Sequence, residues 1–262
     1  VFDRVTTTNA SYRKEWLIHM IDKPTVNGTL TVVEGTSTNG ISDSTDSNLI
    51  TISRGNSKLF SKTLLPTSIK IQLIGGGPLD ATGYHAYVEG TRYPCVRDGV
   101  GGIVESYKYN ADEAGYWRAE ISPTVDAAST IFLHVLEPSA SAQADMTTTS
   151  YVAGTSSTGV SHVALINGSS QKWAAIFNDT ESKATSYAYT ISITGVTKHL
   201  ITDLVAGNYK VIKDGAESAT FTVGDDGTGY FSLSDGGAFN VVPTTSQASA
   251  SQSSGRRNVR WR

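Results

Sequence analysis

The sequence predicts an all-β protein, with a large antiparallel β-sandwich followed by a smaller C-terminal β-sandwich or meander. Short runs of β-branched and aromatic residues recur along the 262 residues, and turn residues bound them. Helical periodicity is almost absent. Serine, threonine and glycine are abundant and charged residues make up only 17%, which is typical of sheets joined by many turns.

The expected strands can be placed in order along the chain. In the first half they are residues 1–5, 15–20, 29–35, 48–55, 68–77 and 130–138. In the second half they are residues 161–168, 172–179, 187–195, 208–215 and 229–236. The dipeptides Asn27-Gly28, Asn167-Gly168, Asp214-Gly215 and Asp235-Gly236 accept positive φ and predict tight turns.

Composition divides the chain into four parts. Residues 1–140 are expected to form the main β-sandwich, and residues 161–243 a small β-sheet domain. Residues 141–160 lose the strand pattern and gain Ser, Thr, Ala and Gly, which predicts a linker. The Ser-rich basic tail, residues 244–262, has too few apolar residues to bury a core by itself.

Charge and cysteine content exclude several classes of protein. The net charge of -3 gives no general attraction for nucleic acid. The single cysteine, Cys95, excludes an intrachain disulfide framework and a cysteine-based zinc site. The five histidines are isolated, so no metal site and no cofactor are expected. No apolar run reaches the ~20 residues of a membrane span. Low Cys and Lys with high Ser and Thr favours an extracellular or periplasmic location.

Three stretches together resemble the C-terminal β-sandwich region of the heparinase II/III-like polysaccharide lyases. They are "VFDRVTTTNASYRKEWLIHM" followed by Pro24, then "GNSKLFSKTLLPTSIKIQLIGGG", then "EAGYWRAEISPTVDAASTIFLHVLEP". Their order and spacing are similar to that family, and "AGNYKVIKDG" with "GYFSL" is similar to its last sheet. The resemblance extends up to Val242.

The resemblance implies β-elimination on a uronic-acid-containing polysaccharide, an acidic polymer. A base removes the C5 proton, a polar group neutralises the carboxylate and the C4 oxygen leaves. In the family, the catalytic residues come from a helical toroid and a His-x-His-x-Asp segment that holds zinc. The sequence contains neither, so no catalytic residue can be transferred. Whether the chain is an enzyme is therefore left open, and we expect the isolated chain not to be catalytic.

The best glycan-contact candidate is the segment "TGYHAYVEGTRYP". Aromatic rings stack on sugar faces, and an arginine can pair with a uronate carboxylate through two hydrogen bonds. The alternative is a hairpin whose tyrosines cover a sheet edge. The candidate substrate-binding residues are Tyr84, His85, Tyr87, Arg92 and Tyr93.

Other polar and glycine residues are interpreted as structural. Alternation in "EWLIHM" places His19 on the same face as Leu17, and a sheet covered on both sides predicts a buried, hydrogen-bonded histidine. The alternative is a residue that lines a cleft. His134 shows the same pattern. The "GGGP" segment, residues 75–78, precedes no helix start, so a flexible loop is expected rather than a phosphate site. No paired-carboxylate site is apparent. The N-glycan acceptor patterns at Asn9, Asn27, Asn167 and Asn178 are interpreted mainly as turns.

Two other functions remain possible from the sequence. One is a non-catalytic extracellular assembly subunit, such as a filament or surface-layer protein. The chain starts within a strand, which suggests a processed or truncated product, so self-assembly could use the Val1–Val5 strand and the Arg256–Arg262 tail. The other is a carbohydrate-binding module that uses the tyrosine-rich segment.

Overall fold

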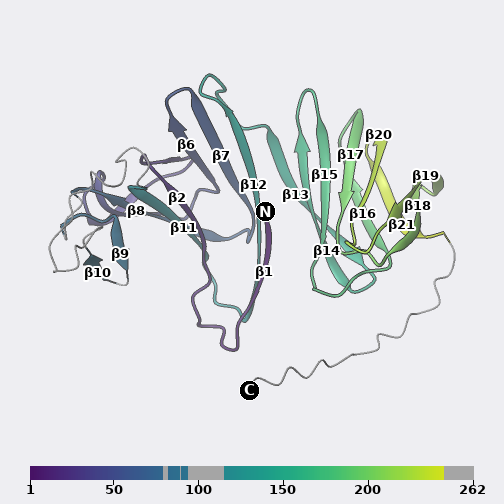
Figure 1. The fold of residues 1–262 in the computed structure, drawn as a ribbon, viewed down its shortest axis with the longest axis horizontal. Helices are drawn as coiled ribbons and strands as arrows, with labels where there is room; N and C mark the ends of the chain where they lie inside the picture. The colour runs from purple at the N-terminus through teal and green to yellow at the C-terminus, as the bar shows by residue number, and fades with distance from the viewer. Residues whose placement is uncertain (79–81, 89, 94–114, 245–262) are drawn as a thin grey trace, which may run out of the picture. The chain divides into compact units, whose positions relative to one another are not determined.

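The computed structural model describes residues 1–78, 82–88, 90–93 and 115–244, and this part of the chain is all-β (Figure 1). The predicted fold class is confirmed. None of the described residues forms a helix with the length and apolar character needed to cross a membrane. The chain divides into two compact units: residues 1–151 with 164–173, and residues 152–163 with the chain from 174 onward.

The first unit contains two antiparallel five-stranded sheets. The β1 sheet has the order β1 (Phe2–Thr6), β12 (Ser129–Ala140), β7 (Ser57–Leu65), β6 (Leu49–Arg54) and β3 (Thr25–Val26). The β2 sheet has the order β2 (Trp16–Met20), β11 (Trp117–Pro123), β8 (Ile69–Gly76), β5 (Asn39–Ser44) and β4 (Thr31–Gly35). A short hairpin, β9 (Ala86–Val88) and β10 (Thr91–Tyr93), lies between β8 and β11 in the sequence.

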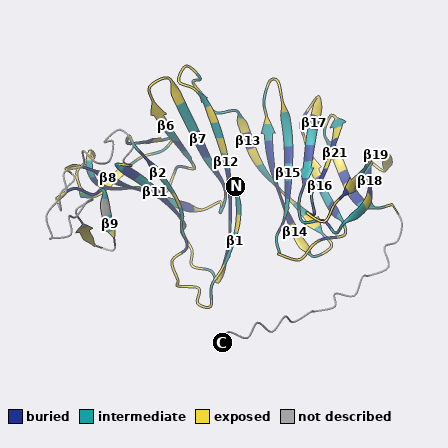
Figure 2. Cartoon of the chain, viewed as in Figure 1, coloured by how far each residue is buried: buried dark blue, intermediate teal, exposed yellow. Residues whose placement is uncertain are grey.

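The core of this unit is built from one face of each sheet. Alternation along β8 buries Ile71 and Leu73 completely, and they pack in one cluster with Ile121 of β11 and Ile50 of β6. Figure 2 shows the buried residues along these strands. Because strands from both sheets supply this cluster, the first unit is a β-sandwich.

His134 of β12 confirms the prediction of a buried structural histidine. It is 1% exposed, and its Nδ1 lies 3.1 Å from the hydroxyl of Thr63. Its ring stacks on Trp16 of the β2 sheet with 4.0 Å between centroids. Burial, and then the nearby N-terminal charge, lower the pKa of His134 to about 3, so the ring is neutral near pH 7.

The C-terminal strands belong to a nine-stranded sheet. Its order is β19 (Ala216–Val223), β18 (Gly207–Lys213), β21 (Gly237–Pro243), β16 (Tyr187–Ile191), β13 (Thr148–Ser156), β14 (Gly159–Asn167), β15 (Lys172–Asn178), β17 (Val196–Ile201) and β20 (Gly229–Ser234).

Aromatic residues show that this sheet folds back on itself. Phe221 of β19 and Phe231 of β20 stack with 5.4 Å between ring centroids, although these strands lie at opposite ends of the strand order. His199 stacks on Phe231 at 4.5 Å and its Nδ1 lies 2.9 Å from the hydroxyl of Tyr189. A curled sheet with a shared aromatic core agrees with a small C-terminal sandwich.

Two local predictions have different outcomes. Asp214 and Gly215 form the two-residue turn between β18 and β19 with φ of 51° and 86°, as their sequence predicts. Residues 148–156, expected within a linker, instead form strand β13. This strand has few large apolar residues, so its hydrophobic alternation is weak. The Arg256–Arg262 tail lies outside the described residues, and β1 is an edge strand of its sheet, so assembly through them stays a prediction.

Candidate functional site

The outer face of the β2 sheet carries two aligned rows of side chains, most of which are polar. Strand pairing places His19 opposite Arg118, Arg118 opposite Ile74, Ile74 opposite Ile41, and Ile41 opposite Glu34. These five residues therefore cross the whole sheet in one row. They lie on the face opposite Ile71 and Leu73, because side chains alternate along each strand, and Tyr84 packs there against Ile41 and Ile74.

A second row runs beside the first. Leu17 pairs with Glu120, Glu120 with Gln72, and Gln72 with Asp43. The Gln72 amide donates a 2.7 Å hydrogen bond to the Asp43 carboxylate. Charged groups, the Gln72 amide and aliphatic side chains thus form the floor of this face, where a ligand that lies on the sheet would contact them.

All residues of the two rows except Asp43 line a hollow of about 830 Å³. Arg13 and Glu15, from the segment that leads into β2, line the same hollow. Three exposed aliphatic side chains also contribute to it: Leu17, Val33 and Val88. We call this hollow the sheet hollow. It combines hydrogen-bonding groups with apolar surface, as small-ligand sites commonly do.

An arginine–glutamate network organises the floor. Arg118 Nε donates to Glu120 at 2.7 Å, and Arg13 contacts the other oxygen of Glu120 and also Glu15. Glu120 is nearly buried, with 7% of its side chain exposed, whereas 55% of Arg13 is exposed. Burial, followed by the charge of Glu120, raises the pKa of Glu15, and Arg13 opposes this shift.

The tyrosine-rich hairpin converges on Glu34 of the edge strand β4. The Tyr84 hydroxyl donates to Glu34 at 2.7 Å, Arg92 donates at 2.8 Å and Tyr87 at 3.4 Å. The Arg92 guanidinium lies 4.2 Å from the centre of the Tyr84 ring. The hydrogen bond from Tyr84, and then that from Arg92, lower the pKa of Glu34. These polar groups fasten the hairpin to the sheet.

His85 fastens the other side of the same segment. Its Nε2 lies 2.6 Å from the carbonyl oxygen of Gly77 and its Nδ1 lies 3.2 Å from that of Tyr116. Since carbonyl oxygens only accept hydrogen bonds, the ring donates through whichever nitrogen carries a proton. His85 therefore connects the end of β8 to the start of β11.

The prediction of a flexible loop at the GGG segment is wrong for its first two residues. Gly75 and Gly76 are buried and paired within β8. A Cβ at Gly76 would lie 2.0 Å from the carbonyl oxygen of Thr38, and its φ is 81°. Glycine is needed there because another backbone approaches too closely for a side chain.

Four of the five sequence-predicted contact residues, Tyr84, His85, Tyr87 and Arg92, are thus brought together, with different exposure. Tyr84 is 1% exposed, and Arg92 is committed to Glu34. His85 and Tyr87 line the sheet hollow. Tyr93 pairs through its backbone with Ala86, and its side chain lies outside the described part. The alternative of tyrosines that cover a sheet edge describes Tyr84 well, and glycan contact by His85 and Tyr87 stays a prediction.

The prediction that His19 is buried is wrong. His19 and Leu17 do share a face, but both are exposed and both line the sheet hollow. The alternation predicted the shared face correctly. The run Trp-Leu-Ile-His-Met is apolar on both sides, so its pattern does not show that only one face is covered.

Tyr84 offers a direct test of the hairpin anchor. Tyr84→Phe is expected to lower the free energy of unfolding of the first unit by about 1 kcal/mol, because Glu34 loses its shortest hydrogen bond. Tyr87→Phe, which removes a 3.4 Å contact to the same carboxylate, is the matched control and should cost less. Urea denaturation of both variants measures the difference, and equal costs would contradict the assigned geometry.

The arginine–glutamate network of the floor could not be predicted from the sequence. Arg13 and Glu120 are 107 residues apart, and neither lies in a recognisable motif. Glu15 and Glu120 therefore did not appear as neighbours, although both contact one guanidinium. Strand register brings them together, and no local pattern indicates it.

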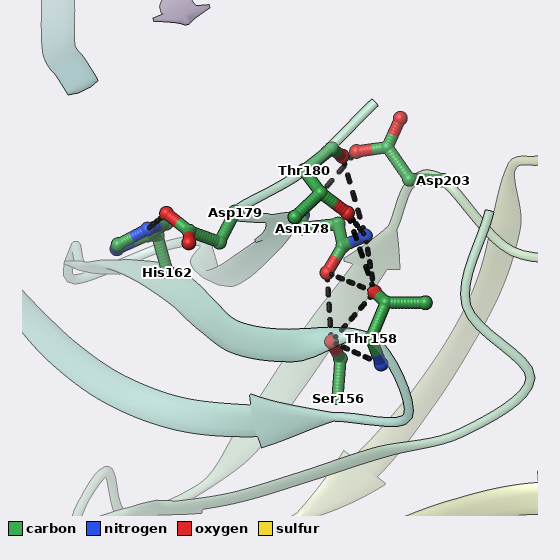
Figure 3. A network of polar contacts seen from close by, with 7 residues as sticks. All are labelled: Ser156, Thr158, His162, Asn178, Asp179, Thr180 and Asp203. Carbon is green, nitrogen blue, oxygen red and sulfur yellow. Dashed lines mark hydrogen bonds and ion pairs between the residues drawn. The ribbon is translucent and has the colours of Figure 1, made fainter. Parts of the chain in front are cut away.

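A second polar network, in the C-terminal unit, is structural (Figure 3). Asn178 is 0% exposed. Its Oδ1 accepts from Ser156 at 2.7 Å, and its Nδ2 donates at 2.7 Å to Thr158 and to the carbonyl of Ser182. His162 and Asp179 form a separate pair at 3.0 Å. The amide of Asn178 connects the turn between β13 and β14 to the segment that follows β15, and it is not exposed to a ligand.

The described residues contain no group of three or more His, Cys, Asp or Glu side chains placed to hold a metal ion. Comparison with known proteins adds no assignment, because no family model and no curated protein matches this chain.

Proposed function

We propose that this chain is the non-catalytic, polysaccharide-binding β-sandwich portion of a secreted protein akin to the heparinase II/III-like lyases. Its ligand is a uronic-acid-containing polysaccharide that lies in the sheet hollow. The observation that carries the proposal is an open sheet face lined by paired charged groups and exposed aliphatic side chains. The resemblance in sequence supports the class of ligand.

The lining matches the chemistry of sugars. Sugar hydroxyls both donate and accept hydrogen bonds, so they suit arginine donors and glutamate acceptors that hold one another in place. The C–H faces of the rings suit Leu17, Val33 and Val88. The Arg13 side chain is 55% exposed, and its Nη1 group is not used by Glu15 or Glu120 and can donate to a uronate carboxylate.

The proposal predicts that Leu17→Glu weakens binding of uronic-acid polymers by at least about tenfold. Leu17 is 46% exposed on the edge strand β2, so the fold tolerates the change, while a new carboxylate in the hollow repels the ligand. Val196→Glu, at a 61% exposed strand position in the other unit, is the matched control and should bind like the parent chain.

Calorimetric titration with heparan sulfate, alginate and polygalacturonate measures this effect, with a neutral glucan as the reference polymer. Equal binding by Leu17→Glu and the parent chain would remove the hollow from the proposal. Absorbance of unsaturated sugar ends should not increase in the same mixtures. Sustained product formation would contradict the non-catalytic assignment.

A further inference from the structure

A smaller hollow of about 440 Å³ adjoins the sheet hollow. Arg13 and Glu15 line both hollows. The smaller hollow is also lined by Tyr12 from the segment before β2 and by Lys70 at the start of β8. We call it the Tyr12 hollow. Since two residues belong to both walls, the two spaces meet at the Arg13–Glu15 pair.

Strand register shows the direction in which the two hollows follow one another. Along β8, Ile74 and Gln72 line the sheet hollow and Lys70 lines the Tyr12 hollow. Along β11, Glu120 lines the first and Ser122 the second, and Ser122 pairs with Lys70. The combined groove therefore runs parallel to β8 and β11. From Ile74 to Lys70 it follows about 13 Å of extended strand.

Hydrogen bonds made by Lys14 and Asn9 fix the backbone of the segment that carries Tyr12. Lys14 is only 5% exposed, and its ammonium donates to the carbonyl oxygens of Ala10 and Tyr12 at 3.2 and 2.8 Å. Asn9 accepts from the backbone N–H of Ser11 at 3.0 Å. Tyr12 itself is 56% exposed. The backbone is thus fixed while the ring is available to a ligand.

Two partly exposed cationic side chains stand along the groove, one at its centre and one at this end. Arg13 stands at the junction, and Lys70 lies 3.7 Å from Asp43 with 38% of its side chain exposed. Glu15 and Asp126 are the acidic residues that line the Tyr12 hollow. Lys14 is used internally, so Arg13 and Lys70 equal these acidic residues in number and act as local contacts for an anionic group.

We propose that the two hollows form one groove for an extended acidic polysaccharide, with Arg13 contacting a uronate carboxylate at the junction and Tyr12 stacking on a sugar beyond it. This inference rests on the proposed function. It adds the direction in which the polysaccharide lies on the sheet and a second set of contacts to it. It predicts that affinity increases with oligosaccharide length until both hollows are filled.

The test uses size-fractionated uronic-acid oligosaccharides, from disaccharides upward, prepared from the polymer that binds best. Tyr12→Ala should weaken the longest oligosaccharides by about tenfold, which corresponds to about 1.4 kcal/mol of stacking. It should change the affinity of the shortest by less than twofold. Tyr230→Ala, at a 50% exposed tyrosine of the other unit, is the matched control and should have no effect.

The outcomes separate the two proposals. Affinity that does not depend on length, together with unchanged binding by Tyr12→Ala, would overturn the groove and leave the sheet hollow as the site. Absence of binding at every length would overturn the proposed function itself. Lys70→Gln provides a second variant: it should weaken only the long oligosaccharides and reduce the salt dependence of their binding.

Discussion

Glu120→Gln is expected to lower the free energy of unfolding of the first unit by about 3 kcal/mol. The carboxylate is 7% exposed and accepts from both Arg118 and Arg13. Arg118 is itself only 11% exposed, so the substitution leaves a nearly buried guanidinium without its anionic partner. The unpaired charge, more than the lost hydrogen bond, accounts for the size of the effect.

Chemical denaturation followed by tryptophan fluorescence measures this loss, because Trp16 and Trp117 pack in the core of the first unit. Glu217→Gln is the matched control. Glu217 is 58% exposed and lies 3.8 Å from Lys210, so its loss should cost less than about 0.5 kcal/mol. Similar costs for the two variants would show that the Glu120 network is as weak as a surface ion pair.

Acidification from pH 7 to pH 4 is expected to remove about 3 kcal/mol of stability from the first unit through His134 alone. Its pKa is lowered from the ordinary value of 6.5 to about 3 by burial and then by the N-terminal charge. The unfolded chain therefore binds a proton that the folded chain excludes. Stability is complete above about pH 6.5 and decreases as the pH falls toward 3.

The variant His134→Phe isolates this contribution. It keeps a flat ring against Trp16 but removes the titrating group and the contact with Thr63. Its stability at pH 7 is lower for that reason, so the informative quantity is the change between pH 7 and pH 4. That change should be about 3 kcal/mol smaller in the variant, since the carboxylates titrate in both proteins. An identical change in both proteins would contradict the neutral buried histidine.

The sequence was sufficient to predict strands and the alternation of their faces. Ile71 and Leu73 point into the core while Lys70 and Gln72 point outward, as their spacing indicates. The turn at Asp214 and Gly215 was also predictable, because its residue types suit positive φ. These features depend on neighbours in the chain, which a single sequence contains.

Which residues line the sheet hollow depends on the register between strands that are far apart in the sequence. A local sequence pattern does not contain that register. The hydrophobic run of β2 could not show that the face with His19 is open. The tyrosine-rich hairpin is evident in the sequence because its residues lie close together along the chain. Tyr84 and Arg92, however, bind Glu34. Arg13 and Glu15 are neighbours in the segment before β2, and only the pairing of β2 with β11 brings Glu120 to them.

If the protein is expressed in a eukaryotic secretory pathway, glycosylation of Asn178 competes with folding. N-glycans are attached to the side-chain amide of asparagine in Asn-x-Ser/Thr patterns while the chain is still unfolded. In the folded protein, the amide nitrogen of Asn178 donates to Ser182 and Thr158 and has no exposed surface. A chain modified there cannot close this network, whereas Asn167, exposed at the end of β14, can carry a glycan. A bacterial host avoids this conflict and is therefore the appropriate source of folded protein.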